Sequence, residues 1–208
     1  ASKGVGAMNP DGHGGVIAAL KSSGGLDEMD SRGINTISYV QIDNPLANVV
    51  DPDFLGIHLC GDSSIEVTSK CVSKSRPDER VGVFCLVNGK TTIVEYSDLS
   101  EQKANKVDEQ GNLRFFAGSI AMHMMSTEFL QRIADDLPWH KAIKRVNHID
   151  LQTGEQIIPE EPNAYKYERF VFDVLPLAEY SLVVETERGE EFAPIKNATG
   201  NDSAITSQ

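Results

Sequence analysis

Residues 11–20 read DGHGGVIAAL, a glycine-rich loop that leads directly into an apolar segment with helical spacing. Glycines at 24–25 end this first helix, and a second short helix is expected at 26–32. A strand rich in β-branched residues follows at 36–42 and ends at Asp43. Loop, helix and strand in this order are typical of an α/β fold, in which helices cover a sheet.

The rest of the chain keeps alternating between helices and strands. The dipeptide Asn88-Gly89 joins two apolar runs, 81–87 and 91–95, and predicts a β-hairpin. Further elements are expected as helices at 100–112, 127–135 with Ser126 as N-cap, and 168–175 before Pro176, and as a last strand at 181–186. The pattern predicts a layered α/β fold with a mixed, largely parallel sheet.

Composition sets limits on function. The 208 residues suffice for one domain with a buried core. The chain carries 19 basic and 31 acidic residues, for a net charge of -12. Because Lys and Arg clusters hold phosphate backbones, this charge argues against a nucleic-acid partner. A small anionic ligand would need a few placed lysines, a helix N-terminus or a divalent cation.

The sequence also carries information on the compartment. It contains no run of about 18 apolar residues and opens on no signal segment, so neither a membrane span nor secretion is expected. The three cysteines, Cys60, Cys71 and Cys85, match neither a zinc motif nor a dense disulfide framework, which suits a reducing compartment. We therefore expect a cytoplasmic protein.

The glycine loop is the first candidate site. Gly12 and its neighbours would let a ligand approach the backbone, and the helix that follows offers free N–H groups. The loop matches neither the P-loop nor the dinucleotide fingerprint, so a plain turn stays an open alternative. His13 lies between glycines and has little to pack against, which leaves both a ligand role and a structural role open.

Charged residues at strand ends form a second group of candidates. Asp43 ends its strand where α/β sheets bind ligands, so its carboxylate could hold Mg²⁺ and phosphate oxygens; the alternative is a turn with Asn44. Glu95 also ends a strand and could accept hydrogen bonds from sugar hydroxyls, or could simply be solvated. For Lys166 and Lys196 a solvated side chain is the ordinary alternative.

The histidines His123, His140 and His148 have no metal-ligand spacing and receive no function.

Four segments in order resemble the UDP-N-acetylhexosamine pyrophosphorylase family: 8–15 (MNPDGHGG), 94–98 (VEYSD), 168–173 (ERFVFD) and 192–198 (FAPIKNA). The stretches 39–44 (YVQIDN) and 116–120 (FAGSI) extend the resemblance over most of the chain. It implies a Rossmann-like nucleotidyltransferase sandwich of the GT-A type. It also implies a reaction in which UTP and a sugar-1-phosphate, with Mg²⁺, give a UDP-sugar and pyrophosphate.

On the nucleotide side, the resemblance implies that Gly12 lies against the nucleotide and His13 near the sugar and phosphates. Asp43 would hold Mg²⁺ and the UTP phosphates, and Lys166 would contact those phosphates. Lys196 would contact the sugar phosphate, so the two lysines are the expected catalytic residues.

On the sugar side, Glu95, with the adjacent Tyr96, would bind polar groups of the sugar, and Ser119 falls where the family contacts the sugar. Animal and fungal members carry Asn in place of both His13 and Ser119, and UDP-glucose pyrophosphorylases have a similar Gly-His-Gly run. UDP-N-acetylglucosamine is the expected product, and UDP-glucose is the alternative.

The family's Gly-Thr-Arg loop is expected upstream of Met8 and has no match here. Residues 1–198 are therefore expected to be the central part of the catalytic domain and 199–208 a polar tail or linker stump, with oligomerisation through exposed edges as an option. A non-catalytic binding remnant stays an alternative. A GT-A glycosyltransferase is disfavoured because its Asp-x-Asp candidate, 51–53, does not close a strand.

Overall fold

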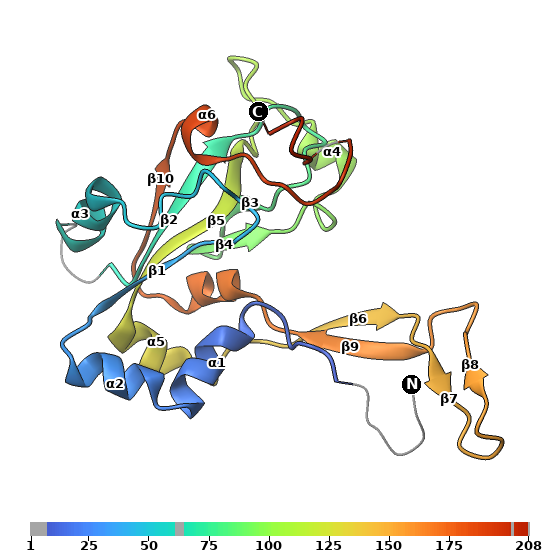
Figure 1. Cartoon of the computed structure of the whole chain (residues 1–208). Helices are drawn as coiled ribbons and strands as arrows, with labels where there is room; N and C mark the ends of the chain where they lie inside the picture. The colour runs from blue at the N-terminus through green and yellow to red at the C-terminus, as the bar shows by residue number, and fades with distance from the viewer. Residues whose placement is uncertain (1–7, 61–64, 201, 208) are drawn as a thin grey trace.

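The computed structural model describes residues 8–60, 65–200 and 202–207 and is built around a six-stranded sheet (Figure 1). The strand order is β10-β2-β5-β3-β4, with β1 also paired to β5. The bounds of these strands are β1 Thr36–Tyr39, β2 Val67–Ser73, β3 Val83–Val87, β4 Lys90–Val94, β5 Ala117–Ser126 and β10 Ser181–Glu185. The expected α/β fold with a mixed sheet is confirmed.

The sheet is mostly antiparallel, so the expected predominance of parallel pairs is wrong. The long central strand β5 runs antiparallel to β1, β2 and β3, and β3 and β4 form an antiparallel hairpin. Among the described residues, β10 and β2 form the one parallel pair within the sheet. Parallel neighbours need a crossover connection, whereas Asn88 and Gly89, both at positive φ, reverse the chain within two residues.

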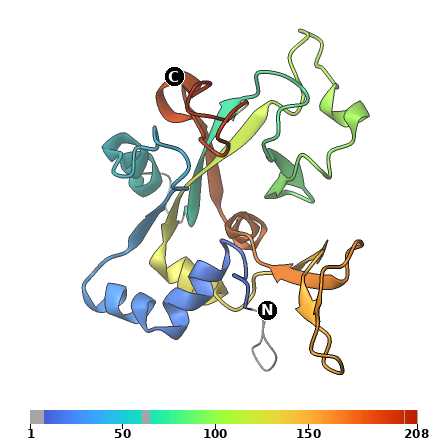
Figure 2. The ribbon, with the colours of Figure 1, turned by 45° about the vertical axis from the view of Figure 1, so that its right-hand side comes forward.

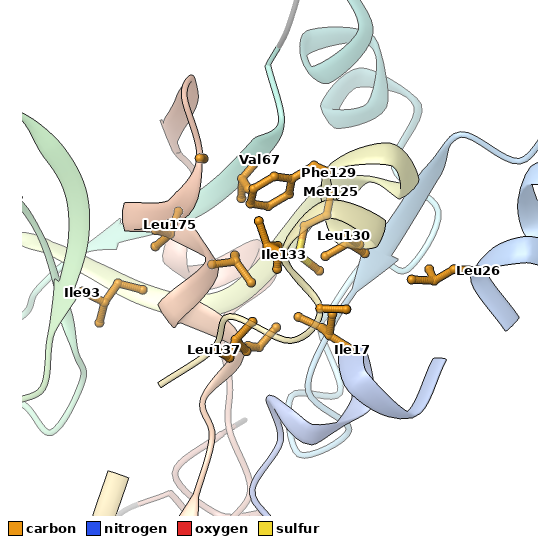
Figure 3. Packing of buried hydrophobic residues seen from close by; sticks show 14 residues of the cluster. Ile17, Leu26, Val67, Ile93, Met125, Phe129, Leu130, Ile133, Leu137 and Leu175 are labelled. Atoms are coloured by element: carbon orange, nitrogen blue, oxygen red, sulfur yellow. The ribbon is translucent and has the colours of Figure 1, made fainter. Parts of the chain in front are cut away.

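Four helical segments pack together at one end of the sheet (Figure 1). They are α1 Gly15–Ser22, α2 Gly25–Ser31, α5 Thr127–Ile133 and the 3₁₀ helix η1 Val171–Leu177. Figure 3 shows side chains from all four converging, with Ile17, Phe129 and Leu175 almost fully buried among them. The Ser126 hydroxyl accepts a hydrogen bond from the Phe129 amide at 3.1 Å, which confirms the expected N-cap of α5.

Two expected helices differ from the structure. The helix predicted at 100–112 is limited to α4, Glu101–Ala104, because the Asp108 carboxylate accepts hydrogen bonds from the Gln110 and Asn112 amides and holds a turn instead. In the helix predicted at 168–175, the first residue belongs to a strand, and the 3₁₀ helix that follows contains Pro176 rather than stopping before it.

Two small two-stranded sheets project from the body as an arm (Figures 1 and 2). In the first, β6 His140–Lys144 pairs with β9 Ala164–Glu168; in the second, β7 His148–Ile149 pairs with β8 Gln156–Ile157. Helix α3 Pro52–Cys60 and the short α6 Arg188–Glu191 lie near β2 and β10. No helix in the described ranges has the length and apolar character that a bilayer crossing requires.

The segment after α6 folds back on the molecule. The Lys196 amide donates to the Asp202 carbonyl at 2.7 Å, and the Ser207 hydroxyl donates to the Pro194 carbonyl at 3.0 Å. Ser203 between them is buried. Residues 1–7 and 61–64 of the expected catalytic segment, and residues 201 and 208 of the expected tail, lie outside the described residues.

Candidate functional site

The glycine loop packs against the protein's own backbone where β9 ends. The Gly14 amide donates to the Arg169 carbonyl at 2.8 Å, and the Arg169 amide donates to the Asp11 carbonyl at 2.7 Å. Gly12 has a φ of 87°, and a Cβ atom there would lie 2.3 Å from the Arg169 carbonyl oxygen. A glycine is required at this position by packing, whatever ligand the loop binds.

His13 is held in one orientation by the start of η1. Its Nδ1 accepts a hydrogen bond from the Val171 amide at 3.0 Å, so the proton of the neutral ring is on Nε2. The ring lies 5.3 Å from the ring of Phe170 and 5.8 Å from that of Phe172. Burial lowers the pKa of His13, against an opposing effect of Asp173 and Glu168, so at neutral pH it presents a neutral N–H donor.

A histidine–aspartate pair lies beside this loop. His140 Nε2 is 2.7 Å from an Asp173 carboxylate oxygen, and the His140 ring lies 4.6 Å from the ring of Phe170. Sequence reasoning assigned no function to His140 because it has no metal-ligand spacing. Asp173 ends the ERFVFD motif, and that motif was the one signal that could have marked the pair.

Glu95 follows β4 and is partly buried in charged surroundings. Burial raises the pKa of the Glu95 carboxyl, and Asp98 and Asp173 raise it further, whereas Lys196 and His140 oppose them. Glu95 therefore lies within the electrostatic range of Asp173, His140 and Lys196. The neighbouring Tyr96 is exposed.

Asp43 and Lys196 face each other across the site. The Lys196 ammonium is 3.8 Å from an Asp43 carboxylate oxygen, and the Ile195 amide donates to the Asp43 carbonyl at 2.8 Å. The Lys196 side chain is 47% exposed and that of Asp43 is 29% exposed, so both can reach a ligand. One carboxylate and one ammonium from distant parts of the chain thus meet in a partly open position.

Ser119 and the Glu95 carboxylate both lie next to Gly82. The Ser119 amide donates to the Gly82 carbonyl at 2.8 Å, and a Cβ atom on Gly82 would lie 3.4 Å from a Glu95 carboxylate oxygen. The Ser119 hydroxyl accepts from the Ala121 amide at 3.3 Å and keeps its own proton for donation.

Lys166 lies within β9, opposite Ala142 of β6. Its ammonium is 2.8 Å from a carboxylate oxygen of Glu168. Glu168 in turn lies against the glycine loop, because a Cβ atom on Gly12 would be 3.0 Å from the Glu168 Cβ. Lys166 is therefore at the base of the arm, on the glycine-loop side of the site.

The family model described as UTP–glucose-1-phosphate uridylyltransferase matches residues 1–202. The chain belongs to this uridylyltransferase family. It is 40% identical over 199 residues to a probable UDP-N-acetylglucosamine pyrophosphorylase of Dictyostelium discoideum, with 93% of this chain and 40% of the relative covered. It is 35% identical over 210 residues to the UDP-N-acetylglucosamine pyrophosphorylase of Saccharomyces cerevisiae, with 97% and 43% covered.

A solved structure gives a close match in fold. A putative UDP-N-acetylglucosamine pyrophosphorylase from Entamoeba histolytica superimposes with a TM-score of 0.84 at 36% identity, covering 96% of this chain and 50% of that one. The expected nucleotidyltransferase-type sandwich is confirmed. The chain spans about 40% of the length of the curated relatives it matches.

The site offers one carboxylate suited to a cation between phosphates. Among the residues that the structure describes, no group of three or more His, Cys, Asp or Glu side chains is arranged to hold a metal ion by itself. Mg²⁺ commonly takes one or two carboxylates and completes its shell with substrate phosphates and water. Asp43, partly exposed, fits that donor set.

Proposed function

We propose that this chain is the central part of a UTP:sugar-1-phosphate uridylyltransferase that forms UDP-N-acetylglucosamine and pyrophosphate. The observation that carries the proposal is the meeting of Lys196 and Asp43 at 3.8 Å, with Glu95 within the electrostatic range of Lys196. An ammonium, a carboxylate and a hydrogen-bonding carboxyl at one partly open position suit a phosphate, a metal–nucleotide and a sugar, respectively. The uridylyltransferase family supplies the reaction class.

The chemistry makes modest demands on the protein. A phosphate oxygen of the sugar-1-phosphate attacks the α-phosphorus of UTP and forms a new P–O bond. The bond from that phosphorus to the bridging oxygen of the β-phosphate breaks, and pyrophosphate leaves with the electron pair. The attacking oxygen is already ionised at neutral pH, so the step depends on alignment and on offsetting charge, and needs no general base.

Each proposed residue has a role in that alignment. Lys196 holds the sugar phosphate and Lys166 the UTP phosphates, since ammonium groups stabilise the negative charge of both ground and transition states. Asp43 would hold Mg²⁺, which when bound supplies positive charge to the triphosphate. Gly12 brings the loop backbone close to the nucleotide.

Four residues would recognise the sugar side. His13 donates from Nε2 toward the sugar and phosphates. Glu95 and Ser119, which both lie close to Gly82, bind polar groups of the sugar together with the exposed Tyr96. Glucose-1-phosphate is the alternative substrate, because the residues at 13 and 119 depart from the Asn found in animal and fungal relatives. We propose a cytoplasmic location for the enzyme.

The test is pyrophosphate release by the full-length parent protein with UTP, Mg²⁺ and either N-acetylglucosamine-1-phosphate or glucose-1-phosphate. Lys196→Ala should lower kcat/KM by roughly 100-fold or more, as the loss of one charge-stabilising donor commonly does. Lys21→Ala is the matched control, because Lys21 lies on α1 and its ammonium pairs with Asp135 at 2.7 Å. No turnover of either sugar by the parent would refute the proposal and leave the binding remnant.

A further inference from the structure

Asn44, which follows the proposed ligand residue Asp43, clamps the segment that leads to Lys196. Its side chain is buried, with only 5% of the residue exposed. The Asn44 Nδ2 donates to the Glu191 carbonyl at 2.7 Å, and its Oδ1 accepts from the Ala193 amide at 3.0 Å. One side chain thus pairs with two backbone groups of the 191–193 segment, which lies just before Lys196.

The other end of this clamp is anchored to the sheet through the Glu191 side chain. The Lys70 ammonium donates to both Glu191 carboxylate oxygens, at 2.7 and 2.5 Å, and the Thr186 hydroxyl donates to one of them at 2.7 Å. Lys70 lies on β2, is 4% exposed, and also pairs with Asp51 at 2.5 Å. Glu191 is therefore fixed relative to β2 and β10.

The ion pair between Lys196 and Asp43 is too weak to fix the position of the Lys196 side chain by itself. Lys196 and Asp43 are 3.8 Å apart, and nearly half of the Lys196 side chain is exposed, so solvent screens their attraction. Buried hydrogen bonds whose loss leaves a polar group unpaired are the stronger restraint. Asn44 is positioned to provide that restraint, since the Asp43 carbonyl beside it also accepts the Ile195 amide at 2.8 Å.

We propose that Asn44 is a positioning residue that holds Lys196 beside Asp43, with the Lys70–Glu191 contact as its anchor. This inference rests on the proposed function, since it gives Lys196 a role in binding the sugar phosphate. Asn44 acts through the chain and not by touching substrate.

The kinetic test is a double-mutant cycle in the full-length parent. Asn44→Ala should lower kcat/KM by tenfold to 100-fold, because misplacing a catalytic group by about 1 Å costs on that order. In the Lys196→Ala background the same substitution should cost less than twofold, because the group it positions is already gone. Asn44→Asp keeps the acceptor for the Ala193 amide but sets a carboxylate oxygen against the Glu191 carbonyl, so its loss should be at least as large as that of Asn44→Ala.

Asn163→Ala is the matched control for this cycle. The Asn163 Oδ1 accepts from the Val146 amide at 2.8 Å and its Nδ2 donates to the Val146 carbonyl at 3.1 Å, so it makes the same kind of clamp on the arm. Any fold-loss of kcat/KM that Asn163→Ala causes should be the same in the parent and in the Lys196→Ala background, so that the two losses multiply. Multiplicative losses for Asn44→Ala as well would overturn the positioning role.

A second measurement does not depend on turnover. Amide hydrogen exchange at Ile195 should speed up at least tenfold in Asn44→Ala and stay within twofold of the parent in Asn163→Ala. Unchanged exchange at Ile195 would overturn the inference even if activity falls. Wild-type turnover in Lys196→Ala would instead remove the role proposed for Lys196, and this inference with it, whatever the exchange data show.

Discussion

His140 Nε2 lies 2.7 Å from a carboxylate oxygen of Asp173, and the two residues come from different elements, β6 and η1. The same carboxylate acts electrostatically on His13 and on Glu95. Asp173 therefore raises the pKa of both His13 and Glu95, two of the residues proposed to bind the sugar, although it was not among the site residues expected from the sequence.

Removal of the Asp173 charge should lower the pKa of both His13 and Glu95. A nearby negative charge favours the protonated form of His13 and of Glu95, so the pKa of each group should fall in Asp173→Asn. The measurement is NMR titration of the His13 ring and the Glu95 carboxyl. Asp136→Asn, a charge change at an exposed position of the body, should leave both pKa values where they are.

Substitution of Gly12 should destabilise the fold much more than substitution of Gly111. Both residues have φ near 86°, at 87° and 85°, so an alanine is strained at either position by about 1–2 kcal/mol. At Gly12 the added Cβ would also meet the Arg169 carbonyl at 2.3 Å, whereas at Gly111 nothing lies within 4 Å. We expect a loss of roughly 3 kcal/mol or more for Gly12→Ala in urea unfolding. Equal losses for the two variants would show that the loop does not pack as described.

Lys70→Met should strongly lower the free energy of unfolding at pH 7. It leaves the Asp51 and Glu191 carboxylates without the ammonium between them, and breaking a buried ion pair commonly costs about 3–5 kcal/mol. Burial opposes ionisation of Asp51, yet the hydrogen bond and charge of Lys70, together with hydrogen bonds from the Phe54 and Asp53 amides, keep the pKa of Asp51 lowered. Lys21→Met removes an exposed pair with Asp135 and should cost about 1 kcal/mol or less.

The cost of Lys70→Met should also shrink in acid. The pKa of Asp51 is lowered from 3.8 in the folded chain, so the stability that this carboxylate contributes is present above pH 3.8 and is lost as the pH falls below it. Chemical unfolding at pH 7 and at about pH 3 measures the difference, and a cost that does not change with pH would mean that the cluster acts through packing alone.

Acid should weaken the fold through His123. Burial, with a smaller effect of His13, lowers the pKa of His123 from 6.5 to about 4. The unfolded chain binds a proton near pH 6.5 and the folded chain does not until about pH 4, so stability falls as the pH drops through that interval. The fully developed loss is on the order of 3 kcal/mol for one such group.

The substitution His123→Leu should flatten the dependence of the unfolding free energy on pH between 6.5 and 4. Part of the slope should persist, because burial also lowers the pKa of His13 and of His58. His148→Gln, at an exposed residue of the arm, should keep the full slope. Absolute stability is not the readout here, since His123 also shares a 2.8 Å hydrogen bond with Ser69.

Elements that depend on nearby residues in the chain could be predicted from the sequence. The hairpin at Asn88-Gly89, the Ser126 cap and the strand at β10 all follow from local turn chemistry or periodicity, and all three are confirmed. The helix expected at 100–112 failed because a side chain, that of Asp108, competed for backbone donors within the same segment. The prediction of a largely parallel sheet was wrong because strand pairing depends on residues that are far apart in sequence.

The sequence by itself determined the family, the α/β class and the residue types available for phosphate and sugar binding, because these follow from motifs and local periodicity. Only the tertiary structure decided which of those residues meet. It placed Lys196 at Asp43, His140 at Asp173, and Asn44 between Glu191 and Ala193. Contacts across such sequence separations depend on how the sheet and its core pack, which no local pattern encodes.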